Sequence, residues 1–157
     1  MNHLIFMTNY QEPECARRPV RSCSGIYPIV SPYELKMVSP FKDLLPPANH
    51  VVFAIAENMM ENGYDMSRPI VTWAGHDNIV IDGHLRLRAA ILADLDKVCV
   101  MEREFESEDH ACIYALESVL NRRHDNGWNP YLYKVLKKFS KRLGSGYLGA
   151  MSGGIYE

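Results

Sequence analysis

The sequence has no long hydrophobic run, and its longest unbroken apolar stretches, such as residues 51–56, have six residues. A helix needs roughly 20 consecutive apolar residues to cross a bilayer, so the sequence predicts no membrane span. Residues 1–7 carry no Lys or Arg, and residues 9–12 do not resemble a signal-peptide cleavage site. We therefore expect a cytoplasmic protein with no membrane partner.

Cysteine is scarce, with 4 residues in a chain of 157, which excludes a disulfide scaffold. Cys99 lies between two valines and Cys112 lies on an expected helix, so both are predicted to be core residues. Cys15 and Cys23 have no second pair of cysteines or histidines at ligand spacing, so no zinc site is predicted.

Net charge is nearly absent, because 17 Lys and Arg oppose 19 Asp and Glu for a total of −2. This balance excludes a uniformly basic nucleic-acid-binding surface. The charge is unevenly distributed, however: residues 102–118 hold one basic and six acidic side chains, whereas residues 119–157 hold seven basic and two acidic ones. Such local asymmetry can mark a site for an anionic partner.

Periodicity and turn residues predict the order of the elements. We expect a short edge strand at 27–30, a helix at 46–62 that packs on the sheet, a hairpin of strands 68–73 and 79–81, a helix at 84–93, a strand at 98–101, and helices from Ser107 to 123 and at 130–143. The fold class is α+β, a small mixed β-sheet with packed helices followed by a helical C-terminal segment.

The expected organisation has four parts, with a single globular domain of ordinary composition at its centre. Residues 1–25 form an irregular leader, 26–124 the α+β domain, 125–143 a basic amphipathic helix and 144–157 a glycine-rich flexible tail.

One stretch combines several groups that bind anions. An apolar strand ends in Asp82 and Gly83 and turns at once into a helix with His84, Arg86 and Arg88. Free backbone N–H groups at a helix start, the positive end of its dipole and nearby guanidinium groups suit a phosphate. Asp82 can hold Mg²⁺ and His84 can carry a proton. Alternatively, Asp82 only caps the helix, Gly83 makes the turn and the arginines lie on a solvated face.

Residues 82–90, with Asn62-Gly63-Tyr64-Asp65 and Arg68-Pro69-Ile70-Val71 before them, resemble the ParB N-terminal domain and its sulfiredoxin-like relatives. The likeness covers about residues 27–124. In that family a Gly-x-x-Arg box opens a helix and binds nucleotide phosphates. The resemblance implies a ParB/sulfiredoxin-like fold and a nucleoside triphosphate ligand, CTP or ATP, with Mg²⁺.

The match differs among the branches of the family. Gly83 and Arg86 match the Gly-Glu-Arg-Arg box of partition proteins, but His84 and Leu85 do not. Sulfiredoxins have Gly-Cys-His-Arg, and His84 stands where they have cysteine, so sulfur transfer should be absent. Members with Asp-Gly-His-His-Arg, including kinases of free serine, differ only at Leu85.

What the resemblance implies about individual residues is phosphate binding by Gly83, His84 and Arg86 and a catalytic or metal-binding role for Asp82, with His84 as a second catalytic candidate. Arg88 and Arg122 are further candidates for phosphate contact.

The C-terminal basic residues are candidates for DNA contact. Arg122 and Arg123 can reach bound phosphates or DNA, or can simply favour the helix dipole. The 130–143 helix carries Lys134, Lys137, Lys138 and Lys141 opposite an apolar stripe, either as a DNA-binding face or as an ordinary solvated one. Residues 125–157 are too few for the helix-turn-helix domain that follows in ParB proteins, so we expect non-specific or partner-assisted DNA contact.

Three functions remain open from the sequence. The first is a ParB-like nucleotide-binding module in DNA transactions such as partition, regulation, or plasmid or phage maintenance. The second is a metal-dependent kinase, NTPase or nuclease using Asp82 and His84, with Glu57, Glu61 or Glu117 as the second acid. The third is a catalytically dead module that binds a protein partner. A homodimer is compatible with each.

Overall fold

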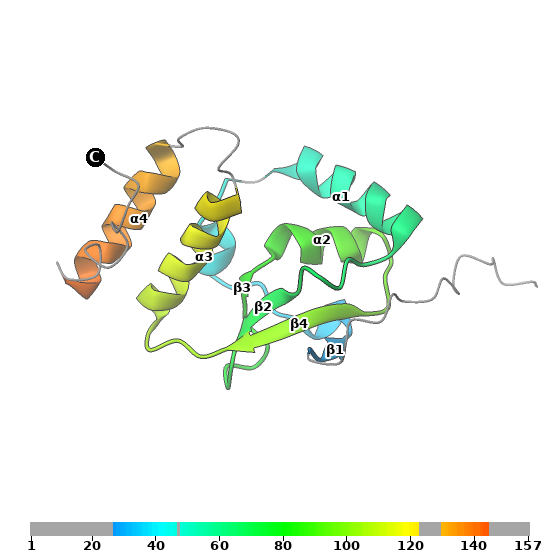
Figure 1. The fold of residues 1–157 in the computed structure, drawn as a ribbon, viewed down its shortest axis with the longest axis horizontal. Helices are drawn as coiled ribbons and strands as arrows, with labels where there is room; N and C mark the ends of the chain where they lie inside the picture. Colours follow the sequence, from blue (N-terminus) through cyan, green and yellow to red (C-terminus); the bar gives the residue numbers. More distant parts are fainter. Residues whose placement is uncertain (1–26, 47, 123–129, 145–157) are drawn as a thin grey trace, which may run out of the picture.

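The computed structural model of the chain describes residues 27–46, 48–122 and 130–144 (Figure 1). The expected leader, Arg123 and most of the expected tail lie outside these residues, as do Cys15 and Cys23. The predicted boundaries of the four parts stay predictions.

A single four-stranded sheet lies at the centre, in the order β1-β4-β2-β3. Its strands are β1 (Ile29–Val30), β2 (Ile70–Trp73), β3 (Val80–Asp82) and β4 (Val98–Arg103). β2 and β3 form the predicted antiparallel hairpin, and β2 pairs in parallel with β4. β1 pairs antiparallel with β4 at the edge of the sheet, where the preceding Pro28 is tolerated. The sheet is mixed, as the sequence predicted.

All four predicted helices are present. They are α1 (Asn49–Asn62), α2 (His84–Leu92), α3 (Glu108–Arg122) and α4 (Pro130–Leu143), and two 3-10 turns precede them, η2 (Pro32–Glu34) and η3 (Phe41–Asp43). α1 ends at Gly63, whose φ of 75° suits glycine. Ser107 caps α3, because its Oγ accepts a hydrogen bond from the His110 backbone N–H at 3.3 Å. The fold is α+β, and α4 has the predicted bounds.

The expected packing of α1 directly on the sheet was wrong. α2 follows β3 after a single residue and therefore lies over the strands itself, and α1 packs on α2 (Figure 1). The small side chains of Ala56, Ala89 and Ala90 are buried in the cluster that joins these helices to the sheet, which allows close packing.

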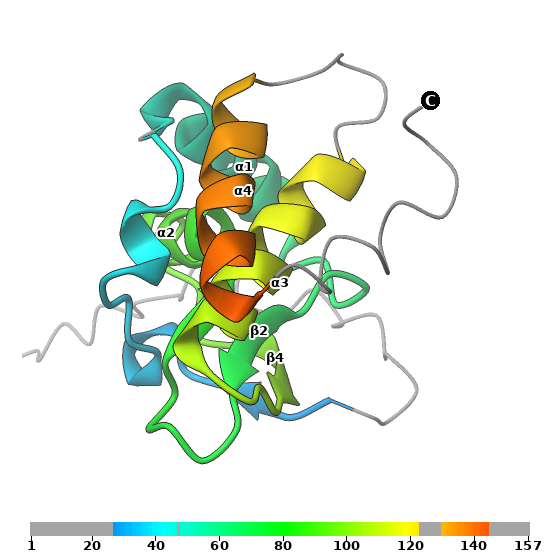
Figure 2. The same ribbon diagram turned by 90° about the vertical axis from the view of Figure 1, so that its left-hand side faces the viewer.

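A second hydrophobic cluster lies on the other side of the fold. It joins α3 and α4 to β3 and η3 through Phe41, Ile81, Leu116, Leu132 and Phe139. Figure 2 shows α4, in orange, beside α3, in yellow. The Asp82 end of β3 therefore lies where α2, α3 and η3 come together.

The two cysteines in the described residues are buried, as predicted. Burial raises the pKa of the Cys112 thiol to about 12, so the thiol stays protonated at neutral pH. Within the described ranges, no helix has both the length and the apolar character needed to cross a membrane.

Candidate phosphate-binding site

The turn between β3 and α2 requires glycine. Gly83 has φ 104° and ψ 18°, in the left-handed region. A Cβ at this position would lie 3.0 Å from Arg86 Nη2 and 3.2 and 3.3 Å from Ile70 Cγ1 and Cα. The first hydrogen bond of the helix joins the Leu87 N–H to the Gly83 carbonyl at 2.9 Å. The N–H groups of residues 84–86 come before this bond in the chain. The backbone of these three residues therefore has N–H groups with no acceptor inside the helix, at the positive end of α2.

A cavity of about 990 Å³ adjoins this turn. Its walls come from the η3 segment, the start of α1, the β3–α2 turn, α3 and the start of α4. The predicted residues Asp82, Gly83, His84, Arg86 and Arg88 all line it. The volume lies at the upper end of the range for small-molecule sites, roughly 300 to 1,000 Å³.

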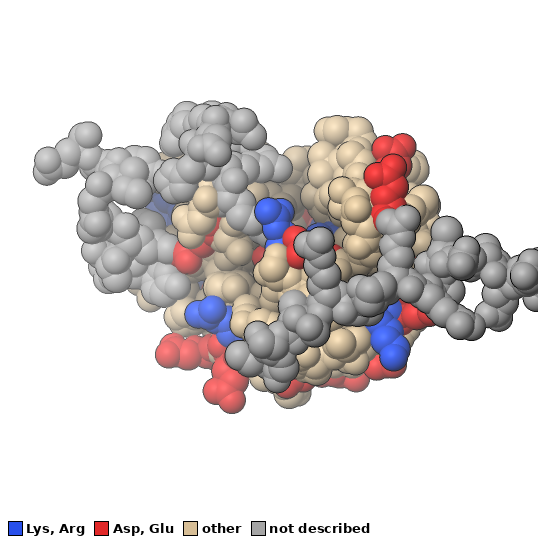
Figure 3. All heavy atoms as spheres, turned by 45° about the vertical axis from the view of Figure 1, so that its right-hand side comes forward, with Lys and Arg blue, Asp and Glu red and all other residues tan. Residues whose placement is uncertain are grey.

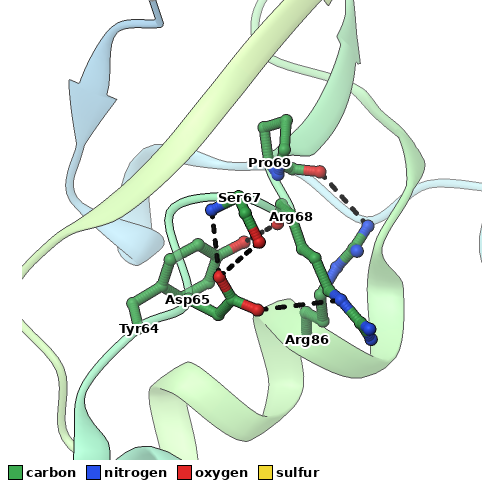
Figure 4. Close-up of polar contacts among 6 residues, drawn as sticks. All are labelled: Tyr64, Asp65, Ser67, Arg68, Pro69 and Arg86. Carbon is green, nitrogen blue, oxygen red and sulfur yellow. Dashed lines mark hydrogen bonds and ion pairs between the residues drawn. The ribbon is translucent and has the colours of Figure 1, made fainter. Parts of the chain in front are cut away.

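Asp82 has Arg86 and Ser118 among its partners inside the protein. Its Oδ2 lies 3.6 Å from Arg86 Nη2 and accepts a hydrogen bond from Ser118 Oγ at 3.2 Å. Arg86 Nη2 also donates to the Pro69 carbonyl at 3.2 Å (Figure 4). The Asp82 and Arg86 side chains are 11% and 15% exposed. Asp82 thus joins β3 to α2 and α3, which is a structural role besides any chemical one.

His84 combines a neutral ring with an unused nitrogen. Burial lowers the pKa of His84, against the opposing effect of the Asp82 and Asp43 carboxylates, so the ring is neutral at pH 7. In the described part of the chain, His84 Nε2 and Arg86 Nε are buried without a hydrogen-bond partner. Buried polar atoms normally have partners. These two belong to residues on the cavity wall, which fits a polar ligand there.

The remaining predicted residues have other positions. Arg88 Nη2 donates to Asn49 Oδ1 at 2.8 Å and so ties α2 to α1. Arg122 ends α3, its side chain lies outside what the structure describes, and its roles stay predictions. On α4 the four predicted lysines are exposed, and Leu132, Leu136 and Phe139 of its apolar stripe are buried.

None of the three suggested second acids is among the residues that line the cavity. Glu57 and Glu61 are exposed on α1. Glu117 has a buried, unpartnered Oε1 on α3, and burial raises its pKa. The described residues contain no group of three side chains that could hold a metal ion, and the Mg²⁺ role of Asp82 stays a prediction.

Sequence reasoning missed several cavity residues. Lys42 and Asp43 come from η3, His50 from α1, Arg68 from the α1–β2 loop and Tyr131 from α4. Most of these segments carry no recognisable motif. They are far apart in the sequence, and only folding brings their side chains to one cavity. Arg68 had a signal, because it directly precedes the Pro-Ile-Val strand.

Charge elsewhere on the surface is mixed. On the face in Figure 3, Lys and Arg atoms occur in small groups, and Asp and Glu atoms lie along its lower edge and at its upper right. The described part of that face therefore has no broad basic surface, in agreement with the overall charge balance.

The α+β fold is similar to that of ParB N-domains, as the resemblance predicted. No family model matches the chain, and no curated protein does. Among solved structures, the chain is similar to a Pnob8-like ParB-N domain, with a TM-score of 0.57 and 18% identity over 80% of this chain and 48% of that one.

Two further similar structures are of the C-terminally truncated chromosome-partitioning protein ParB from Caulobacter crescentus. One is complexed with CTP-gamma-S, with a TM-score of 0.54 and 19% identity over 62% of this chain and 54% of that one. The other is complexed to the centromeric parS site, with a TM-score of 0.53 and 14% identity over 75% and 59%. The chain spans about half the length of these structures, and identities this low show the fold alone.

Proposed function

We propose that the chain is a nucleotide-phosphate-binding module that acts in DNA transactions of the partition type. The observation that carries this proposal is the Gly83 turn, where three backbone donors and Arg86 meet at a cavity of about 990 Å³. The same fold in a partition protein complexed with CTP-gamma-S supports it.

The charge of the cavity favours an anion. On its wall, the four basic side chains of Lys42, Arg68, Arg86 and Arg88 oppose the two carboxylates of Asp43 and Asp82, and these six residues sum to +2. Apolar residues of the second hydrophobic cluster, such as Leu116 and Leu132, line another part of the same cavity. This arrangement suits a nucleotide, because the charged part of the cavity can bind the phosphates and the apolar part can contact the flat faces of the base.

The residues present also fit a bound Mg²⁺ ion. Protein Mg²⁺ sites commonly use one or two carboxylates together with the phosphates of the nucleotide. Asp82 and Asp43 are the carboxylates on the described cavity wall, so either can supply the oxygen ligand. Mg²⁺ would offset part of the phosphate charge. CTP and ATP both remain candidates.

We expect CTP or ATP with Mg²⁺ to raise the melting temperature by about 5 to 10 °C at 100 times Kd, since the ligand binds only the folded state. Arg86→Ala should reduce this shift, measured from the variant's own melting temperature. Arg103→Gln is the control, because Arg103 packs over the Tyr114 ring at 4.5 Å, away from the cavity. No shift with any nucleotide, or an undiminished shift in Arg86→Ala, contradicts the phosphate site.

The second half of the proposal is DNA contact through α4. Its apolar stripe packs on α3, and its exposed lysines, Lys134, Lys137, Lys138 and Lys141, occupy the opposite side of the helix. Such a row can follow a phosphate backbone without reading bases. A similar structure is complexed to the parS site, which supports DNA as the partner.

Replacing Lys134 and Lys138 by glutamine should lower the affinity for DNA and make that affinity less dependent on salt concentration. Each lost phosphate contact lowers the slope of log K against log salt by about 0.9, so we expect a decrease of about 1.8. The matched control replaces Lys36 and Lys97, two exposed lysines outside α4, and changes the net charge equally. Equal slopes for the two double variants would rule out α4 as the DNA-binding face.

A further inference from the structure

Arg68 differs from the other cavity arginines in how its side chain is held. Arg86 is bonded to Pro69 and paired with Asp82, and Arg88 is bonded to Asn49. The Arg68 guanidinium contacts Asp65, with Nε 3.7 Å from Oδ2. That contact leaves the two terminal nitrogens of its planar fork available.

The side chain of Arg68 lies at the outer part of the cavity. It lines the cavity and is nevertheless 71% exposed. The backbone near Arg68 lies beside the β3–α2 turn. Ile70, two residues after Arg68, has its Cα 3.3 Å from the position that a Cβ on Gly83 would occupy. Arg68 and the start of α2 thus line the same cavity, and the Arg68 side chain is on its solvent-exposed part.

The backbone around Arg68 is fixed, as Figure 4 shows. The Tyr64 hydroxyl donates to the Arg68 carbonyl at 2.8 Å, and the next carbonyl, of Pro69, accepts from Arg86 at 3.2 Å. Ser67 donates to Asp65 Oδ1 through its N–H at 3.0 Å and its Oγ at 2.6 Å. Because these hydrogen bonds already hold the loop, its backbone loses little conformational entropy when the Arg68 side chain binds a ligand.

We propose that Arg68 binds the outer phosphate of a nucleoside di- or triphosphate and so disfavours monophosphates. A guanidinium fork binds phosphate oxygens in pairs at about 2.8 Å, which is stronger than one exposed 3.7 Å contact to a carboxylate. A monophosphate at the start of α2 has no second phosphate for Arg68 to bind. This inference rests on the proposed nucleotide site.

The test is calorimetric titration of CTP, CDP and CMP, and of ATP, ADP and AMP, each with Mg²⁺. We expect Arg68→Gln to weaken binding of the di- and triphosphates about tenfold and of the monophosphate less than about twofold. Arg68→Lys keeps the charge but loses the fork and should lie between. Arg103→Gln, an equal charge change outside the cavity wall, should leave every affinity unaltered.

The outcomes separate the inference from the function beneath it. If the wild type binds these nucleotides and Arg68→Gln leaves the ratio of triphosphate to monophosphate affinity unchanged, the role of Arg68 is refuted while the nucleotide site stands. If the wild type binds none of the six nucleotides, both are refuted. Thermal unfolding of each variant verifies that the loop change has not unfolded the protein.

Discussion

Gly83→Ala is expected to lose at least about 2 kcal/mol of stability, and at least about tenfold in nucleotide affinity. Two effects combine at this position. The φ of 104° strains any residue with a Cβ, and the added carbon would lie 3.2 to 3.3 Å from Ile70 and 3.0 Å from Arg86 Nη2. Relief of this crowding must move β2 or the arginine, and either movement alters the β3–α2 turn, where we propose that phosphate binds.

Gly75→Ala is the matched control for this change. Gly75 has a positive φ of 72°, but an added Cβ there meets nothing within 4 Å. Only the backbone strain remains, so we expect a cost of about 1 kcal/mol and unchanged nucleotide affinity. Urea unfolding gives the stabilities and calorimetric titration the affinities. Equal effects at the two glycines would show that close packing at Gly83 is not what the site requires.

Asp82→Ala is expected to cost about 3 kcal/mol, even with no ligand present. The change leaves the Arg86 charge, 15% exposed, without the carboxylate 3.6 Å away, and removes the acceptor for Ser118. Breaking a buried ion pair by removing one partner typically costs about 3 to 5 kcal/mol. Urea unfolding without nucleotide measures this effect.

Asp77→Ala provides the comparison with a surface ion pair. Asp77 pairs with Lys36, and their side chains are 79% and 53% exposed. Exposed pairs contribute about 0 to 1 kcal/mol, so Asp77→Ala should change the stability far less than Asp82→Ala. If the urea midpoint of unfolding of Asp82→Ala equals that of the wild type, the carboxylate has no structural role. The chemical role predicted from sequence then becomes the better explanation for an aspartate at this position.

The elements followed closely from local sequence. The bounds of α4 were predicted because its apolar residues recur at helical spacing, and the β2–β3 hairpin because apolar segments flank a turn cluster. The β3–α2 turn was also predicted, since Asp82 and Gly83 end an apolar strand directly before a helix. These patterns involve residues that are close together in the sequence, and the geometry of the backbone alone determines how such residues lie relative to one another.

Long-range packing could not be predicted in the same way. α1 has an apolar stripe that any apolar surface can bury, and nothing in it distinguishes α2 from the sheet. The expectation that it would cover the sheet failed because α2 already lies there. Likewise, Glu57, Glu61 and Glu117 were suggested as second acids, whereas the carboxylate that joins Asp82 on the cavity wall is Asp43 of η3.

Residue order thus sufficed for the α+β class, the Gly83 turn and the basic side of α4, since strand and helix periods and the need for positive φ act over a few residues. Only tertiary packing determined that η3, the α1–β2 loop, α3 and α4 enclose a cavity at that turn, and that Asp82 is held by Arg86 and Ser118. The physical reason is that hydrophobic burial is non-directional: it requires each stripe to be covered, but it does not specify by which partner.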